Sequence, residues 1–116
     1  MEVSRDEIAG RLDDPTLTVL DVRSATEFDG SGYRCCARQG HIPGARNVDV
    51  VDLLGRPASV VRDLLGVPEG SEIAVYCHSG NRSALAAEVL RAAGYDARNY
   101  AGSWHEWAAE PALPAE

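Results

Sequence analysis

Lysine is absent from the sequence, and all 11 basic residues are arginine, against 18 aspartate and glutamate residues. Without lysine, a mechanism that forms a Schiff base on the protein is excluded. The net charge of −7 argues against general binding to nucleic acid or to an anionic membrane surface, so we expect neither as a partner. Any site for an anion must then be local, built from arginine side chains and backbone amides.

Cysteine is also scarce, and the three that occur are Cys35, Cys36 and Cys77. An odd count without regular spacing does not fit a secreted disulfide scaffold. The sequence has no Cys-x-x-Cys motif and no histidine–cysteine cluster with zinc-site spacing, so we expect no metal. It also lacks an apolar run long enough to cross a bilayer and an N-terminal signal segment, and we expect a cytoplasmic protein.

The 116 residues suffice for one domain, which we place at residues 1–110, followed by a loose C-terminal tail at 111–116. Short β-prone runs alternate with helical patterns along this domain. Such alternation predicts the α/β class, with a small, mostly parallel sheet covered by helices on both faces. The expected strands are residues 17–20, 46–49, 73–76 and 97–100, and the expected helices are residues 5–12, 24–28, 59–65, 84–93 and a last one from 102.

Cys77 stands at a junction, directly after the predicted strand 73–76 and shortly before the predicted helix 84–93. Ser83 is the expected N-cap of that helix, and Leu85, Val89 and Leu90 are expected on one helical face. The first N–H groups of a helix have no partner within the helix and carry partial positive charge. A thiol placed there loses its proton more easily, because the thiolate is stabilised.

Two neighbours of Cys77 strengthen this interpretation. Arg82 adds a permanent positive charge five positions further on, and Gly80 lets the backbone turn where a side chain would block it. The alternative is a buried core cysteine beside an arginine that pairs with a surface carboxylate.

The loop Cys77-His78-Ser79-Gly80-Asn81-Arg82-Ser83 resembles the active-site loop of the rhodaneses, a family of sulfurtransferases. Further stretches resemble the same family in the same order and cover nearly the whole chain. They are Leu20-Asp21-Val22-Arg23 with Glu27-Phe28, Gly40-His41-Ile42-Pro43-Gly44-Ala45 with Asn47, and Tyr100-Ala101-Gly102-Ser103-Trp104-His105-Glu106-Trp107.

The resemblance implies the rhodanese-like fold and an enzyme of the thiosulfate sulfurtransferase type. Cys77 would be the nucleophile that takes a sulfane sulfur from thiosulfate or a related donor and becomes a persulfide. A thiol or cyanide would then accept that sulfur, so no metal or organic cofactor is expected. The substrate-binding loop would consist of His78, Ser79, Gly80, Asn81, Arg82 and Ser83, whose backbone amides would stabilise the thiolate and the persulfide.

Asp21 and Arg23 follow the first predicted strand, at the edge where open parallel sheets place their sites. We expect them to support the site or to form a structural ion pair, and Asp21 would orient loop amides or hold Arg82. His41 is expected to be structural and His105 to lie on the surface. Trp104 and Trp107, three positions apart, are expected to pack in the core.

The sequence departs from the best-known thiosulfate and mercaptopyruvate enzymes in two ways. Those enzymes are tandem proteins with a catalytic second domain, and they carry arginine where this chain has Glu27. Arg34 or Arg38, in the long connection between residues 24 and 39, is the alternative partner for an anionic donor. Cys35 and Cys36 in the same connection are either incidental surface thiols or partners of Cys77 in a redox lock.

Three alternatives to the small-molecule enzyme follow from these residues. Four residues separate Cys77 from Arg82, whereas related phosphatase loops have five, so the tighter loop favours one sulfur atom over a phosphate. A non-catalytic partner-binding module would need no cysteine at position 77. A sulfur carrier that takes sulfur from a protein donor, or passes it to a protein acceptor, would keep Cys77.

Overall fold

The computed structural model describes residues 1–32 and 34–116. Within these residues four strands form one parallel sheet in the order β2-β1-β3-β4, and five α-helices and one 3-10 helix surround it. The strands are β1 (Leu17–Asp21), β2 (Arg46–Asn47), β3 (Glu72–Tyr76) and β4 (Asp96–Asn99). The helices are α1 (Arg5–Ala9), α2 (Ala25–Asp29), η1 (Val50–Asp52), α3 (Ala58–Leu65), α4 (Asn81–Ala92) and α5 (Ser103–Ala109).

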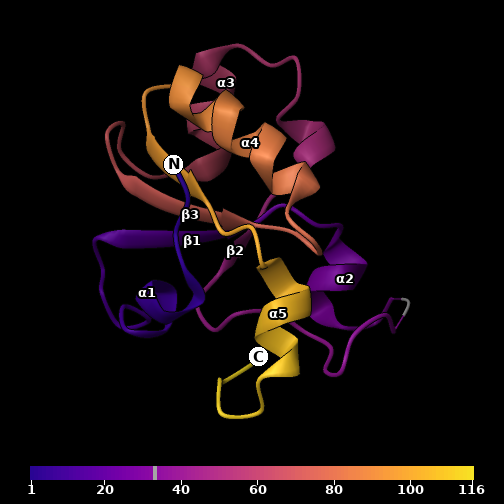
Figure 1. Ribbon diagram of the computed structural model, residues 1–116. Coiled ribbons are helices and arrows are strands. Elements are labelled where there is room, and N and C mark those ends of the chain that lie inside the picture. The colour runs from indigo at the N-terminus through magenta and orange to yellow at the C-terminus, as the bar shows by residue number, and fades with distance from the viewer. Residues whose placement is uncertain (33) are drawn as a thin grey trace.

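The sheet has one helical layer on each face. Helices α3 and α4 lie on one side, and α1 and α5 lie on the other (Figure 1). The α/β class that the sequence predicted is therefore confirmed. None of the helices in the described residues is long and apolar enough to span a membrane.

Alternation along the strands decides which layer each side chain meets. In β3, Ile73 and Val75 pack with α3 and α4, whereas Ala74 and Tyr76 pack with α1 and α5. Cys77 continues this alternation and belongs to the α3–α4 core. The thiol therefore points toward the layer in which α4 begins.

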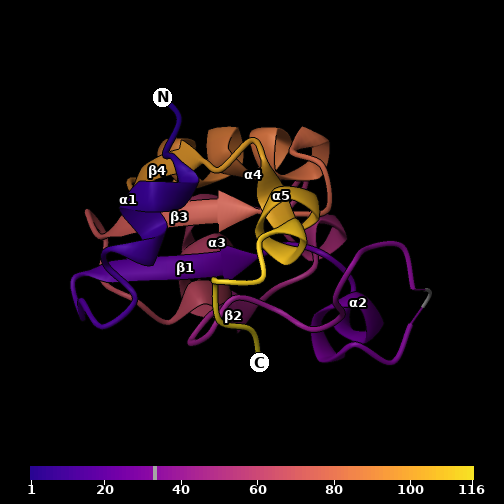
Figure 2. The same ribbon diagram turned by 60° about the horizontal axis from the view of Figure 1, so that its bottom comes forward.

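The C-terminal ends of β1 and β3 form the edge that matters for function. Asp21 pairs with Tyr76 in the parallel register, so the residues after each strand emerge side by side. Figure 2 shows the two strands ending next to each other and next to α5. This geometry brings Arg23 and Cys77, which follow β1 and β3, to one edge of the sheet.

The predicted start of α4 is wrong. The helix begins at Asn81, with Gly80 as its N-cap, and Ser83 lies buried in the first turn instead of capping it. The predicted face is also wrong, because Leu85 is 52% exposed. The helix packs its alanines against the sheet, since small side chains allow close approach: the buried positions are Ser83, Ala86, Ala87 and Leu90.

Two other boundaries also lie earlier than predicted. Helix α1 ends at Ala9, followed by Gly10 as its C-cap, three residues before the predicted end. Strand β2 stops at Asn47, because the Asp49 side chain accepts a hydrogen bond from the Val51 amide and caps η1.

Residues 111–116, which the sequence sets apart as a tail, lie back along the domain. The Trp107 indole N–H donates to the Pro114 carbonyl at 2.7 Å, and the backbones of His41 and Glu116 exchange two hydrogen bonds. The boundary at residue 110 stays a prediction.

Burial of Trp107 predicts its contribution to stability. Its side chain is fully buried, as the sequence led us to expect, so Trp107→Ala should lower the free energy of unfolding by about 3–5 kcal/mol. Urea unfolding followed by circular dichroism measures this loss. The exposed Leu85→Ala is the control and should change stability by about 0.5 kcal/mol or less. Equal losses in both variants would contradict the described packing.

Candidate active site

Both backbone polar groups of Cys77 are hydrogen-bonded to the start of α5. Its N–H donates to the Ser103 hydroxyl at 3.1 Å, and its carbonyl accepts from the Trp104 amide at 2.9 Å. Ser103 is buried and has a φ of +56°, a backbone conformation that is unusual for a residue with a side chain. Sequence reasoning treated Ser103 only as part of a helix start, and its role in holding Cys77 was missed.

The Cys77 sulfur lies at the centre of a ring of hydrogen-bond donors. The Gly80 amide is 3.1 Å from Sγ, and the amide and hydroxyl of Ser83 are each 3.4 Å away. Burial by itself would raise the pKa of the Cys77 thiol. Hydrogen bonds from Ser83, Gly80 and Ser79 outweigh burial, so the pKa is lowered. The site is therefore built to hold a negatively charged sulfur atom.

Gly80 is required at its position for two reasons. Its φ of +99° suits glycine, and a Cβ atom there would lie 2.5 Å from the Ala101 carbonyl oxygen. Its carbonyl also accepts a hydrogen bond from Asn99. The backbone at Gly80 therefore lies close to Ala101, and in this position its amide points at the Cys77 sulfur.

Arg82, in the first turn of α4, is paired with Glu27 of α2. Its two terminal nitrogens donate to the two carboxylate oxygens of Glu27 at 2.9 and 3.0 Å. The hydrogen bond from Arg82 is the main reason that the pKa of Glu27 falls from 4.5 to about 2. Of the two roles expected for Asp21, holding Arg82 is therefore wrong, because the Arg82 guanidinium is bonded to Glu27 instead.

Asp21 and Arg23 form a buried ion pair. The shortest distance between them is 2.7 Å, and their side chains are 0% and 2% exposed. Arg23 also donates to the Gly40 carbonyl, and its guanidinium lies over the rings of Tyr76 and Trp104. These contacts join β1, the Gly40 turn and α5, so the pair braces the elements around Cys77.

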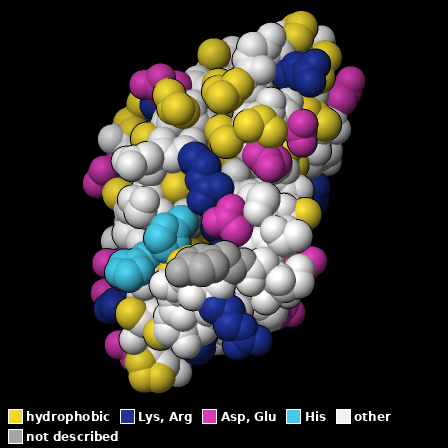
Figure 3. Space-filling view, turned by 90° about the vertical axis from the view of Figure 1, so that its right-hand side faces the viewer, with side chains coloured by type: hydrophobic (Ala, Val, Ile, Leu, Met, Phe, Trp, Pro, Cys, Tyr) yellow, Lys and Arg dark blue, Asp and Glu magenta, His cyan; other side chains and the backbone are white. Residues whose placement is uncertain are grey.

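The other loop residues differ in their surroundings. His78 is half-buried, whereas Ser79 and Asn81 are exposed. The His78 ring meets the ring of the exposed His105 edge-on, with centroids 5.7 Å apart. Histidine side chains gather on the face shown in Figure 3, with an arginine and an acidic side chain next to them.

Arg38 is not available as a substitute anion ligand. Its guanidinium donates to backbone carbonyls near the end of α5 and in the C-terminal segment, at Trp107, Ala108, Glu110 and Leu113. Arg34 is exposed. His41 is structural, as expected: it lies 2.8 Å from the Phe28 carbonyl oxygen and stacks on the Phe28 ring.

Cys35 and Cys36 contact each other, with their sulfur atoms 3.1 Å apart. Burial and the neighbouring Cys35 raise the pKa of the Cys36 thiol, the reverse of the shift at Cys77. Cys36 is therefore the weaker nucleophile at neutral pH. The two alternatives for Cys35 and Cys36, incidental surface thiols or partners of Cys77 as a resolving thiol or redox lock, both stay open.

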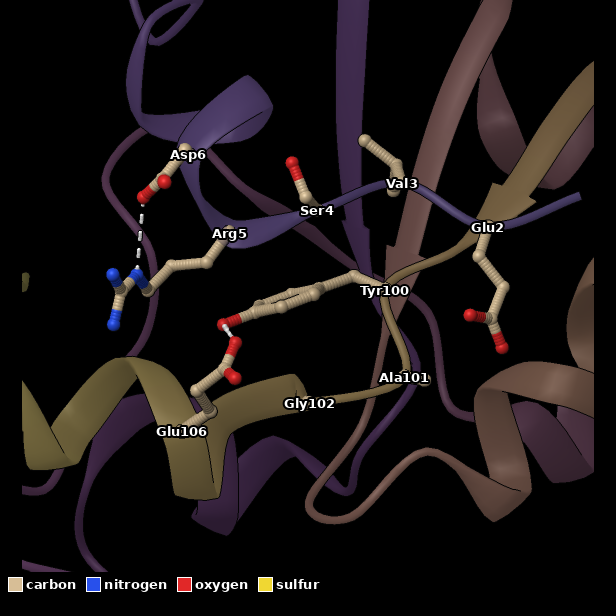
Figure 4. A pocket seen from close by; sticks show the side chains of 9 residues that line it. All are labelled: Glu2, Val3, Ser4, Arg5, Asp6, Tyr100, Ala101, Gly102 and Glu106. Carbon is tan, nitrogen blue, oxygen red and sulfur yellow. Dashed lines mark hydrogen bonds and ion pairs between the residues drawn. The ribbon is translucent and has the colours of Figure 1, made fainter.

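A separate cavity of about 340 Å³ lies between the N-terminal segment and the start of α5 (Figure 4). Tyr100 donates to Glu106 inside it, and Arg5 pairs with Asp6 at its rim. Cys77 is not among its lining residues. Ala101 separates the two regions, because its carbonyl oxygen limits the space at Gly80.

Removal of the Ser83 hydroxyl tests whether the hydrogen-bond donors around the Cys77 sulfur stabilise its thiolate. Ser83→Ala should raise the pKa of Cys77 by about one unit, because the thiolate loses a charge-assisted hydrogen bond. Mass spectrometry of the Cys77 peptide after timed alkylation across a pH series measures the shift. Ser59→Ala, at an exposed position in α3, is the matched control. An unchanged pH profile in Ser83→Ala would show that the hydroxyl does not stabilise the thiolate.

Comparison with known proteins matches the chain to one family. The profile of the rhodanese-like domain covers residues 4–110. A thiosulfate sulfurtransferase of Azotobacter vinelandii is 35% identical over 97% of this chain and 45% of its own length. The sulfur carrier protein TtuD of Thermus thermophilus is 34% identical over 77% of this chain and 37% of its own length.

A solved structure agrees with these sequence matches. The crystal structure of a probable thiosulfate sulfurtransferase superposes with a TM-score of 0.84 at 46% identity, covering 99% of this chain and 47% of the other. The chain thus spans about half the length of the relatives it matches. From its Cys77 loop, its parallel sheet and these matches, the chain belongs to the rhodanese-like domain family.

Proposed function

We propose that this protein is a sulfurtransferase that moves a sulfane sulfur through a persulfide on Cys77. The observation that carries the proposal is the convergence of the Gly80 amide and both Ser83 donors on the Cys77 sulfur. The thiosulfate sulfurtransferases among its relatives support the same reaction class. We assign the activity to the single domain of residues 1–110.

In the first step the Cys77 thiolate attacks the outer sulfur of thiosulfate or a related donor. The donor's S–S bond breaks, and sulfite leaves with its electron pair when thiosulfate is the donor. The product is a persulfide whose terminal sulfur carries the negative charge. Hydrogen-bond donors that already face Sγ favour this charge near the loop, and no reorganisation is needed.

In the second step an acceptor attacks the terminal sulfur of the persulfide. Cyanide takes that sulfur as thiocyanate, or a thiol takes it as a new persulfide, and the Cys77 thiolate is released. The lowered pKa of Cys77 makes it a good leaving group. The cycle as written uses a covalent intermediate on the protein and requires neither a metal nor an organic cofactor.

Arg82 and Glu27 govern how an anionic donor approaches. A free Arg82 would attract thiosulfate, but Glu27 occupies both terminal nitrogens of its guanidinium. This pairing favours a second candidate, in which the protein is a sulfur carrier loaded from a protein or thiol persulfide. The sulfur carrier among its relatives supports that alternative. Protein donors and acceptors and a cytoplasmic location stay predictions.

Replacement of the nucleophile tests the reaction class. Wild type incubated with thiosulfate should gain the mass of one sulfur atom and produce thiocyanate when cyanide is added. Cys77→Ser should show neither, because serine forms no persulfide. Intact mass spectrometry and the thiocyanate assay measure the two steps, and circular dichroism checks that the variant is folded.

The control is the double variant Cys35→Ser/Cys36→Ser, which should keep the sulfur adduct because Cys77 is unchanged. Loading from a thiol persulfide, with poor turnover of thiosulfate, would favour the sulfur carrier. No adduct on wild type from any of these donors would overturn the proposal and leave a partner-binding module.

Neutralising Glu27 tests its effect on the donor. Glu27→Gln should lower the KM for thiosulfate about fivefold, because a pair worth about 1 kcal/mol no longer competes for Arg82. Steady-state thiocyanate formation measures KM and kcat separately. Glu88→Gln, an exposed position on α4, makes the same change in charge and should leave KM unchanged. A rise in KM for Glu27→Gln would mean that Glu27 holds Arg82 in its productive position.

A further inference from the structure

Two thiols and an imidazole from distant parts of the sequence cluster beside the Cys77 loop, and a second imidazole lies next to one of the thiols. The ligand atoms of Cys35, Cys36 and His78 all lie within 4.8 Å of one another. The fourth donor is Nδ1 of His105, which lies 3.9 Å from the Cys36 sulfur. Thiolate sulfur and imidazole nitrogen are the donor set that zinc prefers.

The distances suit one tetrahedral ion. Zinc binds sulfur at about 2.3 Å and nitrogen at about 2.0–2.1 Å, so its ligand atoms stand about 3.3–3.8 Å apart. The two cysteine sulfurs are 3.1 Å apart, and the cysteine–histidine contact is 3.9 Å. The Cys35, Cys36 and His78 ligand atoms, all within 4.8 Å of one another, need to close in by about 1 Å at most, and His105 would join them by rotation of its exposed side chain.

His78 supplies an independent observation. Its Nε2 is buried and has no hydrogen-bond partner among the described residues. A buried polar atom without a partner is costly, and a bound ion would satisfy it. The backbone holds this imidazole against the second histidine, because the His105 amide donates to the His78 carbonyl at 3.0 Å.

We propose that Cys35, Cys36, His78 and His105 bind a zinc ion next to the Cys77 loop. As the ion binds, each thiol releases its proton to solvent, and the two thiolates neutralise the charge of Zn²⁺. The net charge of −7 on the chain favours the approach of a cation. Nothing is oxidised or reduced in this step.

Zinc bound at this site blocks sulfur transfer. His78 directly follows Cys77, so the ion ties the connection that carries Cys35 and Cys36 to the loop around the nucleophile. The sulfur donor can then no longer reach the Cys77 sulfur. This consequence rests on the proposed function, whereas binding of the ion does not.

Binding is tested in the Cys77→Ser variant, so that the nucleophile cannot hold the metal. The reduced protein is titrated with Co²⁺, whose thiolate complexes absorb in the near ultraviolet, and with Zn²⁺ by calorimetry. We expect one ion per chain and a thiolate–cobalt band. Adding Cys35→Ser/Cys36→Ser, or His105→Ala, should weaken binding about tenfold or more.

Two results would overturn the site. One is binding by wild type that Cys77→Ser abolishes and Cys35→Ser/Cys36→Ser leaves intact, because the metal would then sit on the nucleophile. The other is no binding to any of these proteins. Both readouts are independent of sulfur transfer, so they stand even if the proposed function fails.

Inhibition is measured without cyanide, which itself binds zinc. Intact mass spectrometry follows how fast thiosulfate, or a thiol persulfide, adds sulfur to Cys77. One equivalent of Zn²⁺ should slow this step at least tenfold in wild type, and a chelator should restore it. Cys35→Ser/Cys36→Ser should load sulfur normally and resist zinc. Equal inhibition of that variant would overturn the blocking role.

Discussion

The convergence of hydrogen-bond donors on one buried sulfur is the interaction on which this structure depends. Cys77 is 1% exposed, and burial opposes ionisation of its thiol. Donors from the turn at Gly80 and the first turn of α4 reverse that effect. The donors stay in place because the N–H and C=O of Cys77 are both hydrogen-bonded to the start of α5. Gly80 also has no side chain that would clash with Ala101. The charge on the sulfur thus depends on how the Cys77 loop packs against the start of α5.

Three arginines form hydrogen bonds or ion pairs around the site, in a chain that carries an excess of acidic residues. Arg23 is buried with Asp21 and braces the elements around the site, and Arg38 ties the long connection to the end of α5. Of these three, only Arg82 belongs to the segment after Cys77, and Glu27 binds both of its terminal nitrogens. Glu27 therefore balances the charge of Arg82, so a dianionic donor meets less attraction here than an unpaired arginine would provide.

The long connection between residues 24 and 39 has two roles in this picture. At one end, Ser24 and Glu27 form a capping box that also positions the carboxylate for Arg82. Toward the other end, adjacent thiols lie against the imidazoles of His78 and His105. The same segment thus sets the charge at the opening and supplies the thiols for control of access by a metal ion.

Four features could be predicted from the sequence: the α/β class, the position of Cys77 after β3, the buried tryptophans of α5 and the family. These features follow from short-range patterns: apolar runs, helical spacing and motifs of a few residues. Tertiary structure decided that Ser83 faces the sulfur instead of capping α4, that Glu27 holds Arg82, and that Ser103 holds Cys77. It also brought Cys35 and Cys36 to His78. Ser83 and Cys77 are only six positions apart, but the turn that brings them together depends on the close approach of Gly80 to Ala101. The other contacts join residues remote in the chain, so they depend on how the connections cross the sheet edge, which no local pattern encodes.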